Sequence, residues 1–377
     1  MRERVNTQLK KELRQFGIDR WNDCFHCGNC TAICPLTEQD YVFPRDGIRT
    51  IQIGSKKDLS TSLEPWLCYY CGECSTYCPR SANPGEIMMS LRRYLTSVYD
   101  WTGLARKMYT SKIWEFGAII FFALVILALF LVFSKIPEAS ERLTADGGVA
   151  INKFAPVKWI HLGDWIMAGL LVILLASNIF NMFLKVIIRD KTVSVPITLY
   201  FKEFWAIIWH FGSQWRFSKC EEKPYWLVHW FLMSGYVILF TMIVFFLNWF
   251  QTDNIYDWFH PQRILGYYAT AGLFIGIIYF IFSRIRKIKE HHKYSHVTDW
   301  TFLVLLFLTT LSGILLHVFR INGLPYAAYY MYVAHLMVLV PMLVLEVPFS
   351  KWSHLAYRPF AIYFARVKQQ ARKQNKR

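Results

Sequence analysis

Six long apolar runs follow a polar N-terminal third of the chain, and they constrain the fold more than any other feature. Each run approaches the ~20 residues that an α-helix needs to cross the hydrocarbon core of a bilayer. Backbone groups inside lipid must be hydrogen-bonded within the segment, and continuous apolar runs of this length meet that requirement as helices. The predicted spans lie near residues 116–133, 157–179, 226–249, 264–282, 301–319 and 326–347. We therefore predict an all-α protein with a six-span transmembrane helical bundle.

Charge and composition agree with a membrane protein and predict its orientation. Hydrophobic residues make up 54% and charged residues only 18% of the 377 residues, which is too apolar for a soluble protein of this size. The net charge of +16 raises the possibility of nucleic-acid binding, but Lys and Arg gather beside the spans, as the positive-inside rule requires. We therefore expect membrane lipid rather than nucleic acid as a partner. The basic segments 185–223, 284–293 and 351–377 share one side of a six-span bundle with the N-terminal head, so both termini are predicted to be cytoplasmic and the membrane to be the inner (cytoplasmic) one.

The same pattern divides the chain into a head, a membrane domain and a tail. Residues 197–217 are apolar but contain Lys202, Glu203, His210 and Arg216, so we predict an interfacial amphipathic helix there; a seventh span would break the charge asymmetry. The polar segment Met1–Asp19 lacks the apolar core of a signal peptide, and a reducing compartment is therefore expected. The predicted domains are residues 1–110 (head), 111–359 (membrane domain) and 360–377 (basic cytoplasmic tail).

The head contains two copies of the spacing C-x2-C-x2-C-x3-C-P, at Cys24–Pro35 and Cys68–Pro79. This spacing is typical of two-cluster ferredoxins, in which three cysteines of a motif bind one [4Fe-4S] cluster and the fourth binds the other cluster. Gly28 and Gly72 allow the backbone to approach each cluster closely. Structural zinc is the alternative, but zinc prefers paired C-x2-C ligands. We therefore predict a helical two-cluster ferredoxin domain with ligand sets Cys24, Cys27, Cys30, Cys78 and Cys68, Cys71, Cys74, Cys34.

A ninth cysteine, Cys220, stands alone before the third span, and we expect it to be an inert packing residue.

Several histidines at the spans indicate haem b, which needs axial ligands from separate helices. Ionisable residues inside lipid are costly and are therefore candidates for function. His335 and His354 bracket the sixth span, 19 residues apart, and a helical bulge near Pro341 or Pro348 would bring them onto one face. We pair His229 with His354 for an inner haem b. For an outer haem we pair His335 with His161, in preference to His317 and His260.

The remaining histidines and the acidic residues within the spans have weaker interpretations. His291, His292 and His296 lie in a basic loop and are expected to be solvated. Glu346 and Asp164 lie within spans, where each could either relay protons to a quinone or make a structural polar contact.

The residues around the cysteine motifs resemble those of the C subunit of heterodisulfide reductases: Phe43-Pro44-Arg45, Trp66-Leu67-Cys68 and Tyr77-Cys78-Pro79-Arg80. The membrane part resembles the cytochrome b subunit of the same enzymes and, more distantly, the nitrate reductase gamma subunit. The matching residues are Phe217–Cys220, His229, Thr310–Gly313 and Pro348–Pro359. The order of fusion is similar to that in the membrane subunits of quinone-interacting membrane-bound oxidoreductase complexes. The nitrate reductase protein has a second histidine ten residues after the first, and this chain has Leu239 there, so the outer haem needs another ligand or is absent.

The resemblance implies two [4Fe-4S] clusters, one or two b haems and menaquinone or another quinone as substrate. It also implies flavoprotein partners similar to the heterodisulfide reductase A subunit, with electrons exchanged with adenylylsulfate reductase. We therefore expect a membrane electron-transfer subunit of a respiratory complex. The alternatives are a heterodisulfide-reductase-like module with a different catalytic partner and, from another class, a membrane transporter with an iron–sulfur sensor head.

Overall fold

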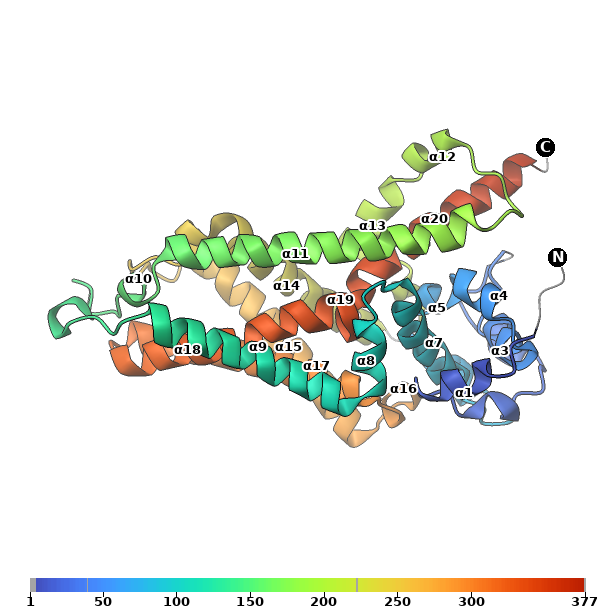
Figure 1. Cartoon of the computed structure of the whole chain (residues 1–377), viewed down its shortest axis with the longest axis horizontal. Helices are drawn as coiled ribbons and strands as arrows, with labels where there is room; N and C mark the ends of the chain where they lie inside the picture. The colour runs from blue at the N-terminus through green and yellow to red at the C-terminus, as the bar shows by residue number, and fades with distance from the viewer. Residues whose placement is uncertain (1–4, 39, 222, 376–377) are drawn as a thin grey trace.

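The computed structural model describes residues 5–38, 40–221 and 223–375, and these residues are predominantly helical (Figure 1). Within them, extended pairing is limited to two isolated β-bridges, Glu38–Tyr41 and Leu143–Val149. The prediction of an all-α protein is confirmed. Residues 1–4 of the predicted head and residues 376–377 of the predicted tail lie outside the described residues.

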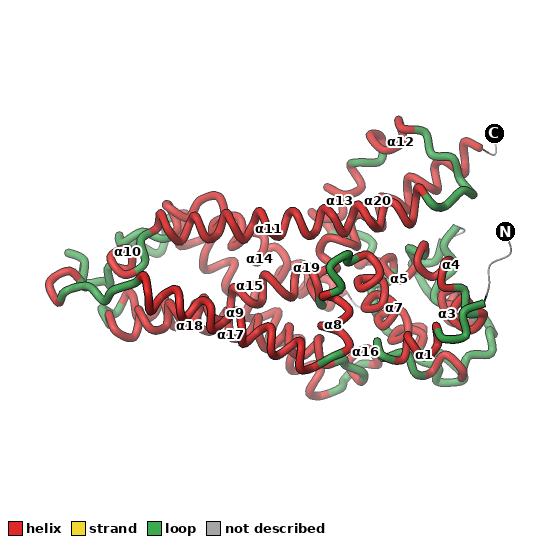
Figure 2. The backbone as a smooth tube through the Cα atoms, viewed as in Figure 1, coloured by secondary structure: helices red, strands yellow, loops and turns green. Residues whose placement is uncertain are grey.

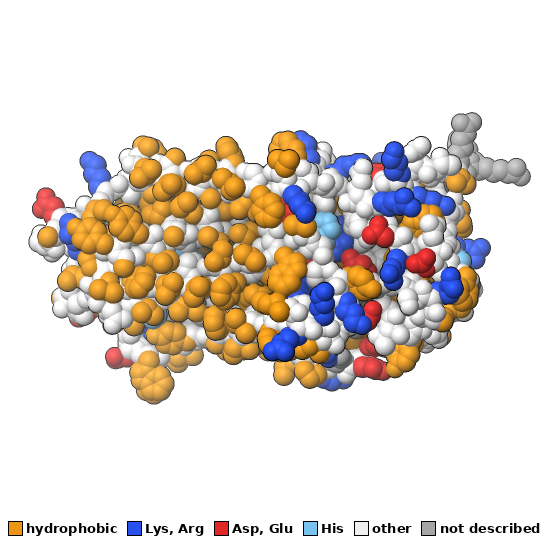
Figure 3. Space-filling view, turned by 90° about the horizontal axis from the view of Figure 1, so that it is seen from below, with side chains coloured by type: hydrophobic (Ala, Val, Ile, Leu, Met, Phe, Trp, Pro, Cys, Tyr) orange, Lys and Arg blue, Asp and Glu red, His pale blue; other side chains and the backbone are white. Residues whose placement is uncertain are grey.

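Within the part of the chain that the structure describes, six helices are long and apolar enough to cross a membrane, so the chain is a multi-pass membrane protein with the predicted number of spans. Figure 3 shows hydrophobic side chains over the surface of the bundle and charged side chains gathered at the head. The spans are α9 (Lys112–Phe133), α11 (Val157–Phe183), α14 (Lys223–Phe250), α15 (Pro261–Arg286), α17 (Val297–Ile321) and α18 (Pro325–Pro341) with its continuation η5 (Met342–Glu346) and α19 (Val347–Phe349).

Each span extends beyond its predicted apolar run at one or both ends, and two of them, α9 and α17, begin at a side-chain cap outside that run. The side chain of Ser111 accepts a hydrogen bond from the backbone N–H of Trp114 at the start of α9. His296 and Asp299 form a capping box at the start of α17. At these two helices a polar side chain, rather than the apolar run, sets where the helix begins.

The head consists of short helices around the buried helix α7 (Pro84–Tyr99). Ile87, Leu91 and Leu95 of α7 are fully or almost fully buried in the main apolar cluster of the head. The surrounding helices are α1 (Leu9–Arg14), α2 (Asn29–Ala32), α3 (Arg45–Ile53), α4 (Lys56–Thr61), α5 (Glu64–Leu67), α6 (Glu73–Thr76) and α8 (Leu104–Thr110), the last of which leads into α9.

The segment predicted as one amphipathic helix forms two short helices, α12 (Ile197–Lys202) and α13 (Trp205–Ser213). Trp205 and Trp209 are 71% and 67% exposed, whereas His210 is buried on the opposite face of α13. This two-sided arrangement places aromatic side chains outward at the head end of the bundle.

The last helix, α20 (His354–Asn375), includes the residues predicted as a basic tail and packs against the head and α13. The bulge expected in the sixth span is present as the π-helical turn η5, directly after Pro341. The chain then breaks at Ser350, so His354 starts a new helix and does not extend the face that carries His335. Both ends of the described chain lie at the head end of the bundle (Figure 2).

Candidate redox centres

The two cysteine motifs have the same backbone path. Gly28 and Gly72 have φ of +86° and +91° and start the short helices α2 and α6. Only glycine adopts this left-handed region without steric cost, which explains its place in the repeated spacing. His26 and Tyr70 also have positive φ at equivalent positions, two residues before each glycine. The sequence repeat is therefore a structural repeat.

The fourth cysteine of each motif lies beside the other motif. All nine cysteines have free thiols. Burial, together with the neighbouring sulfurs of Cys24, Cys27 and Cys78, raises the pKa of Cys30 to about 11. Burial likewise raises the pKa of Cys34 to about 11, and there the neighbouring sulfurs are Cys68 and Cys71. These groups match the two ligand sets that the spacing predicts.

Two arginines that the sequence did not single out meet at the second motif, and one of them, Arg358, reaches it from outside the head. Arg358 of α20 donates to the carbonyls of Trp66 and Cys68, both at 3.3 Å, and its guanidinium lies 4.5 Å from the centre of the Tyr69 ring. Arg92 of α7 also donates to the Cys68 carbonyl. Two buried cations therefore meet at the first cysteine of this motif.

His229 of α14 and His354 at the start of α20 form a pair at the head end of the bundle, with ring centroids 6.4 Å apart. An iron held in line between two imidazoles, at metal–nitrogen distances of about 2 Å, places the ring centroids roughly 6 Å apart. The Nδ1 of His229 donates to Oε1 of Gln214, and the Nδ1 of His354 donates to the carbonyl of Lys351, each at 2.8 Å. Such outer hydrogen bonds are typical of metal-ligating histidines and leave both Nε2 atoms available for iron.

The two imidazoles line a cavity between the bundle and the head. Much of its wall is aromatic, with Tyr69, Phe217, Tyr236, Phe280 and Trp352 among the lining residues. Cationic side chains also line it: Arg92, Arg93, Arg284, Lys351 and Arg358. An apolar macrocycle with two carboxylate side chains, as haem b has, matches a wall of this composition.

The structure does not bring His335 and His161 together. The Nδ1 of His335 lies 2.9 Å from Oγ of Ser312. The Nε2 of His161 lies 3.0 Å from the carbonyl oxygen of Val244 and 2.9 Å from Nε1 of Trp165. Among the described residues, no histidine ring packs against that of His335. Of the two histidine pairs that the sequence predicts, the structure brings His229 and His354 together.

His317 and His260, the other candidates for an outer haem ligand, make polar or stacking contacts with neighbouring side chains. His317 accepts from Arg263 at 3.0 Å, and the ring of His260 stacks on Tyr256 at 3.8 Å. These contacts match the ordinary interfacial role that the sequence left open for both residues.

The prediction that His291 and His292 are solvated is wrong, because each is only 3% exposed. His291 packs against Tyr225 and Tyr70, with centroids 4.9 and 5.9 Å away. The basic sequence around them suggests solvent, but the second cysteine motif covers them. His296 is half-buried and caps α17.

Glu346 and Asp164 remain without an assigned role. Glu346 is fully buried, with Ser350 and Glu115 as polar neighbours, whereas Asp164 is half-buried near His161. Glu115 is itself only 1% exposed, so two carboxyl groups from different helices meet inside the head end of the bundle.

Comparison with known proteins covers the head. Residues 20–82 match the family model of the 4Fe-4S dicluster domain. The chain is 30% identical over 126 residues to a heterodisulfide reductase C-like protein of Archaeoglobus profundus; the match covers 32% of this chain and 66% of that protein. No solved structure matches the chain. The head is therefore a 4Fe-4S dicluster domain similar to the heterodisulfide reductase C-like protein, and the chain is an iron–sulfur electron-transfer protein with a multi-pass membrane domain.

Proposed function

We propose that the chain transfers electrons between a membrane quinone and cytoplasmic flavoprotein partners, through one haem b and two [4Fe-4S] clusters. The observation that carries this proposal is the imidazole pair His229–His354, placed between the bundle and the second cysteine motif. Bound haem and clusters supply one-electron chemistry, and the chain supplies ligands, orientation and charge around them.

The residues around the imidazole pair have separate tasks in this proposal. His229 and His354 would supply the ligands of the haem iron, while Gln214 and Lys351 fix the orientation of each ring. The cationic wall that includes Arg284 and Arg358 would bind the carboxylate side chains of the macrocycle. Because both ligand histidines lie at the head end of the bundle, we assign them to an inner haem.

A chain of aromatic contacts supports an electron route from this site to the head. The ring of Phe217 lies 5.5 Å from His229 and stacks on Tyr69 at 5.0 Å. Tyr69 directly follows Cys68, the first cysteine of the second motif. The proposed route therefore runs from the imidazole pair to the second motif and then to the first.

The first motif supports a docking site for the partner. Cys27 is exposed, and Phe25 and Tyr77 beside it are 58% and 53% exposed. We propose that a flavoprotein similar to the heterodisulfide reductase A subunit binds here and links the chain to adenylylsulfate reductase. The basic residues at the head end support a cytoplasmic head at the inner membrane.

The similarity to a heterodisulfide reductase C-like protein favours one alternative, the same relay coupled to a different catalytic partner. Affinity purification of the full chain from its native membrane separates the two proposals by the partner that it retains.

Optical spectroscopy tests the haem assignment directly. We expect a reduced-minus-oxidised b-type spectrum for the full chain, and reduction of that band by a menaquinol analogue. His229→Leu and His354→Leu should each remove the band, while His335→Leu and His161→Leu should retain it. A full-length protein with both clusters and no haem, or a band that survives His354→Leu, would contradict the proposal.

A further inference from the structure

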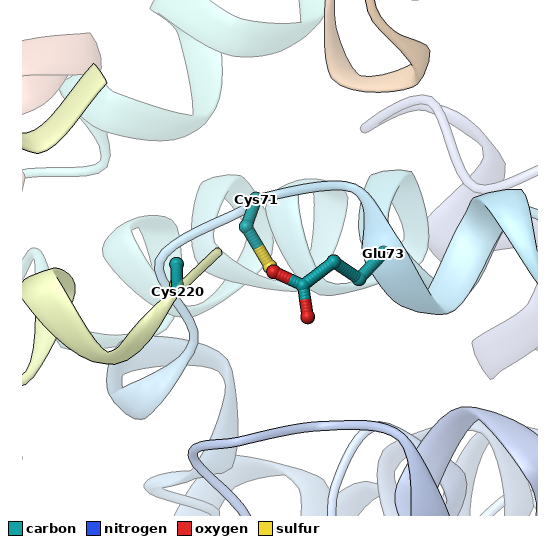
Figure 4. A group of neighbouring side chains, drawn as sticks. All are labelled: Cys71, Glu73 and Cys220. Atoms are coloured by element: carbon teal, nitrogen blue, oxygen red, sulfur yellow. The ribbon is translucent and has the colours of Figure 1, made fainter. Parts of the chain in front are cut away.

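Cys220 is buried against the second cysteine motif, although it comes from the membrane domain. It follows the short turn η4 (Phe217–Lys219) and is 1% exposed. Its sulfur, the sulfur of Cys71 and a carboxylate oxygen of Glu73 all lie within 4.8 Å of one another (Figure 4). The ninth cysteine of the sequence is therefore a direct neighbour of an expected cluster ligand.

The turn that carries Cys220 is fixed on both sides. After it, the backbone N–H of Glu221 donates to Oε1 of Glu73 at 3.1 Å. Before it, the ring of Phe217 stacks on Tyr69 with an interplanar angle of 18°. Both anchors belong to the second motif, so the thiol is held at one place beside Cys71.

We propose that Cys220 is a positioning residue that donates an S–H···S hydrogen bond to Cys71 and raises the reduction potential of the cluster at the second motif. The proposal rests on the ligand set Cys34, Cys68, Cys71 and Cys74 and is independent of the haem. In this arrangement Cys71 would bind iron as a thiolate and accept the bond, and the thiol of Cys220 would be the donor.

The sign of the effect follows from charge. Reduction adds an electron whose charge is shared by the cluster and its ligand sulfurs. A donor to one of those sulfurs stabilises the reduced state more than the oxidised state, so it raises the potential. Burial strengthens the effect, because water does not screen the bond.

The cluster of the first motif serves as an internal control for the cluster of the second motif. The residue equivalent to Cys71 is Cys27, which is exposed. Cys220 therefore acts on one cluster only and separates the potentials of two clusters that have the same ligand spacing.

The test is a redox titration of the full chain followed by electron paramagnetic resonance. We expect Cys220→Ala to shift the midpoint of one cluster to a lower potential and to leave the other unchanged. Cys220→Ser keeps a hydroxyl donor and should give a smaller shift. Ser218→Ala is the matched control, because its hydroxyl donates to the Trp215 carbonyl at 2.8 Å within the same turn; it should shift neither midpoint.

Glu73→Gln gives a second reading with the opposite sign. It removes a negative charge beside the same cluster but keeps an acceptor for Glu221, so the midpoint should rise. No shift in Cys220→Ala, equal shifts of both clusters, or loss of one cluster would each overturn the proposal. If Cys220→Ala shifts the midpoint of one cluster but the protein contains no haem, the role of Cys220 is supported and the proposed function is contradicted. If the protein shows a haem band but Cys220→Ala shifts no midpoint, the proposed function is supported and the role of Cys220 is contradicted.

Discussion

The two cysteine motifs share their spacing and their backbone path but lie in different surroundings. In the first motif Cys27 is exposed, and in the second Cys68 and Cys74 are buried. Arg92 and Arg358 meet at the carbonyl of Cys68, and that contact joins the second motif to the membrane domain. Similar ligand geometry is therefore used once at the surface and once inside an interface.

This difference teaches that the cysteine spacing specifies the type of cluster, whereas packing around the motif specifies its position in a relay. The exposed motif suits contact with a soluble partner. The buried motif suits electron exchange with a site in the membrane domain. The following predictions test that division, beginning with the largest expected effect.

The first prediction concerns the exchange of the fourth cysteines. Cys34→Ala should remove the cluster of the second motif, and Cys78→Ala should remove the cluster of the first, although each residue belongs to the opposite motif. Non-haem iron should fall in each variant from about eight to about four atoms per chain. Iron analysis with resonance spectra of both variants checks this, and loss of the same cluster in both would contradict the crossed assignment.

The second prediction concerns the arginines around the second motif. Arg358→Ala deprives the Trp66 carbonyl of a buried donor and should lower the free energy of unfolding by about 2 kcal/mol. Arg358→Lys should restore little of this lost stability, because an ammonium group does not reproduce the planar set of donors of a guanidinium group. Arg80→Ala, beside the first motif and exposed, should change stability by less than about 0.5 kcal/mol. Thermal unfolding in detergent measures all three, and equal losses for Arg80 and Arg358 would remove the contrast between the motifs.

The third prediction compares the two glycines. Gly28→Ala should cost about 1 kcal/mol, because φ of +86° disfavours a side chain and only the flexible end of Arg45 lies nearby. Gly72→Ala should cost about 1 kcal/mol more, since its Cβ would also lie 3.2 Å from the backbone nitrogen of His291. Unfolding curves of the pair provide the measurement. Gly28→Ala as the more damaging change would be the contrary result.

The fourth prediction concerns pH and the contact between Tyr69 and His210, whose Oη and Nδ1 atoms are 3.2 Å apart. Burial and the cations Arg358 and Arg216 lower the pKa of His210 to about 3. Because the unfolded value is about 6.5, stability from neutral His210 is complete above that pH and is lost as the pH falls from 6.5 toward 3. Between pH 7 and 6 the loss should stay below about 1 kcal/mol. His210→Phe should weaken the dependence of the free energy of unfolding on pH below 6.5. An unchanged pH dependence in this variant would contradict the prediction.

Much of the architecture follows from local sequence patterns. The six spans, the bulge after Pro341 and the two motif glycines depend on residues close together in the chain, so hydropathy and spacing predict them. Helix ends were less predictable, because caps such as Ser111 lie outside the apolar runs.

The surroundings of the candidate site were not predictable in the same way. Arg358 and Cys220 lie against the second motif only because the head packs onto the rest of the chain. His291 and His292 look solvated in sequence for the same reason, since the segment that buries them is more than 200 residues away. Histidine spacing identified the pair His229–His354, but it also suggested His161 for His335, which the fold does not bring together.

We propose that two clusters and one haem form a single electron relay in this chain. The most direct test is to measure non-haem iron, acid-labile sulfide, haem and zinc in one preparation of the full-length protein. We expect about eight non-haem iron atoms, about eight sulfides and one haem per chain, with no stoichiometric zinc. A preparation in which zinc replaces iron, or in which fully loaded clusters occur without haem, would contradict it.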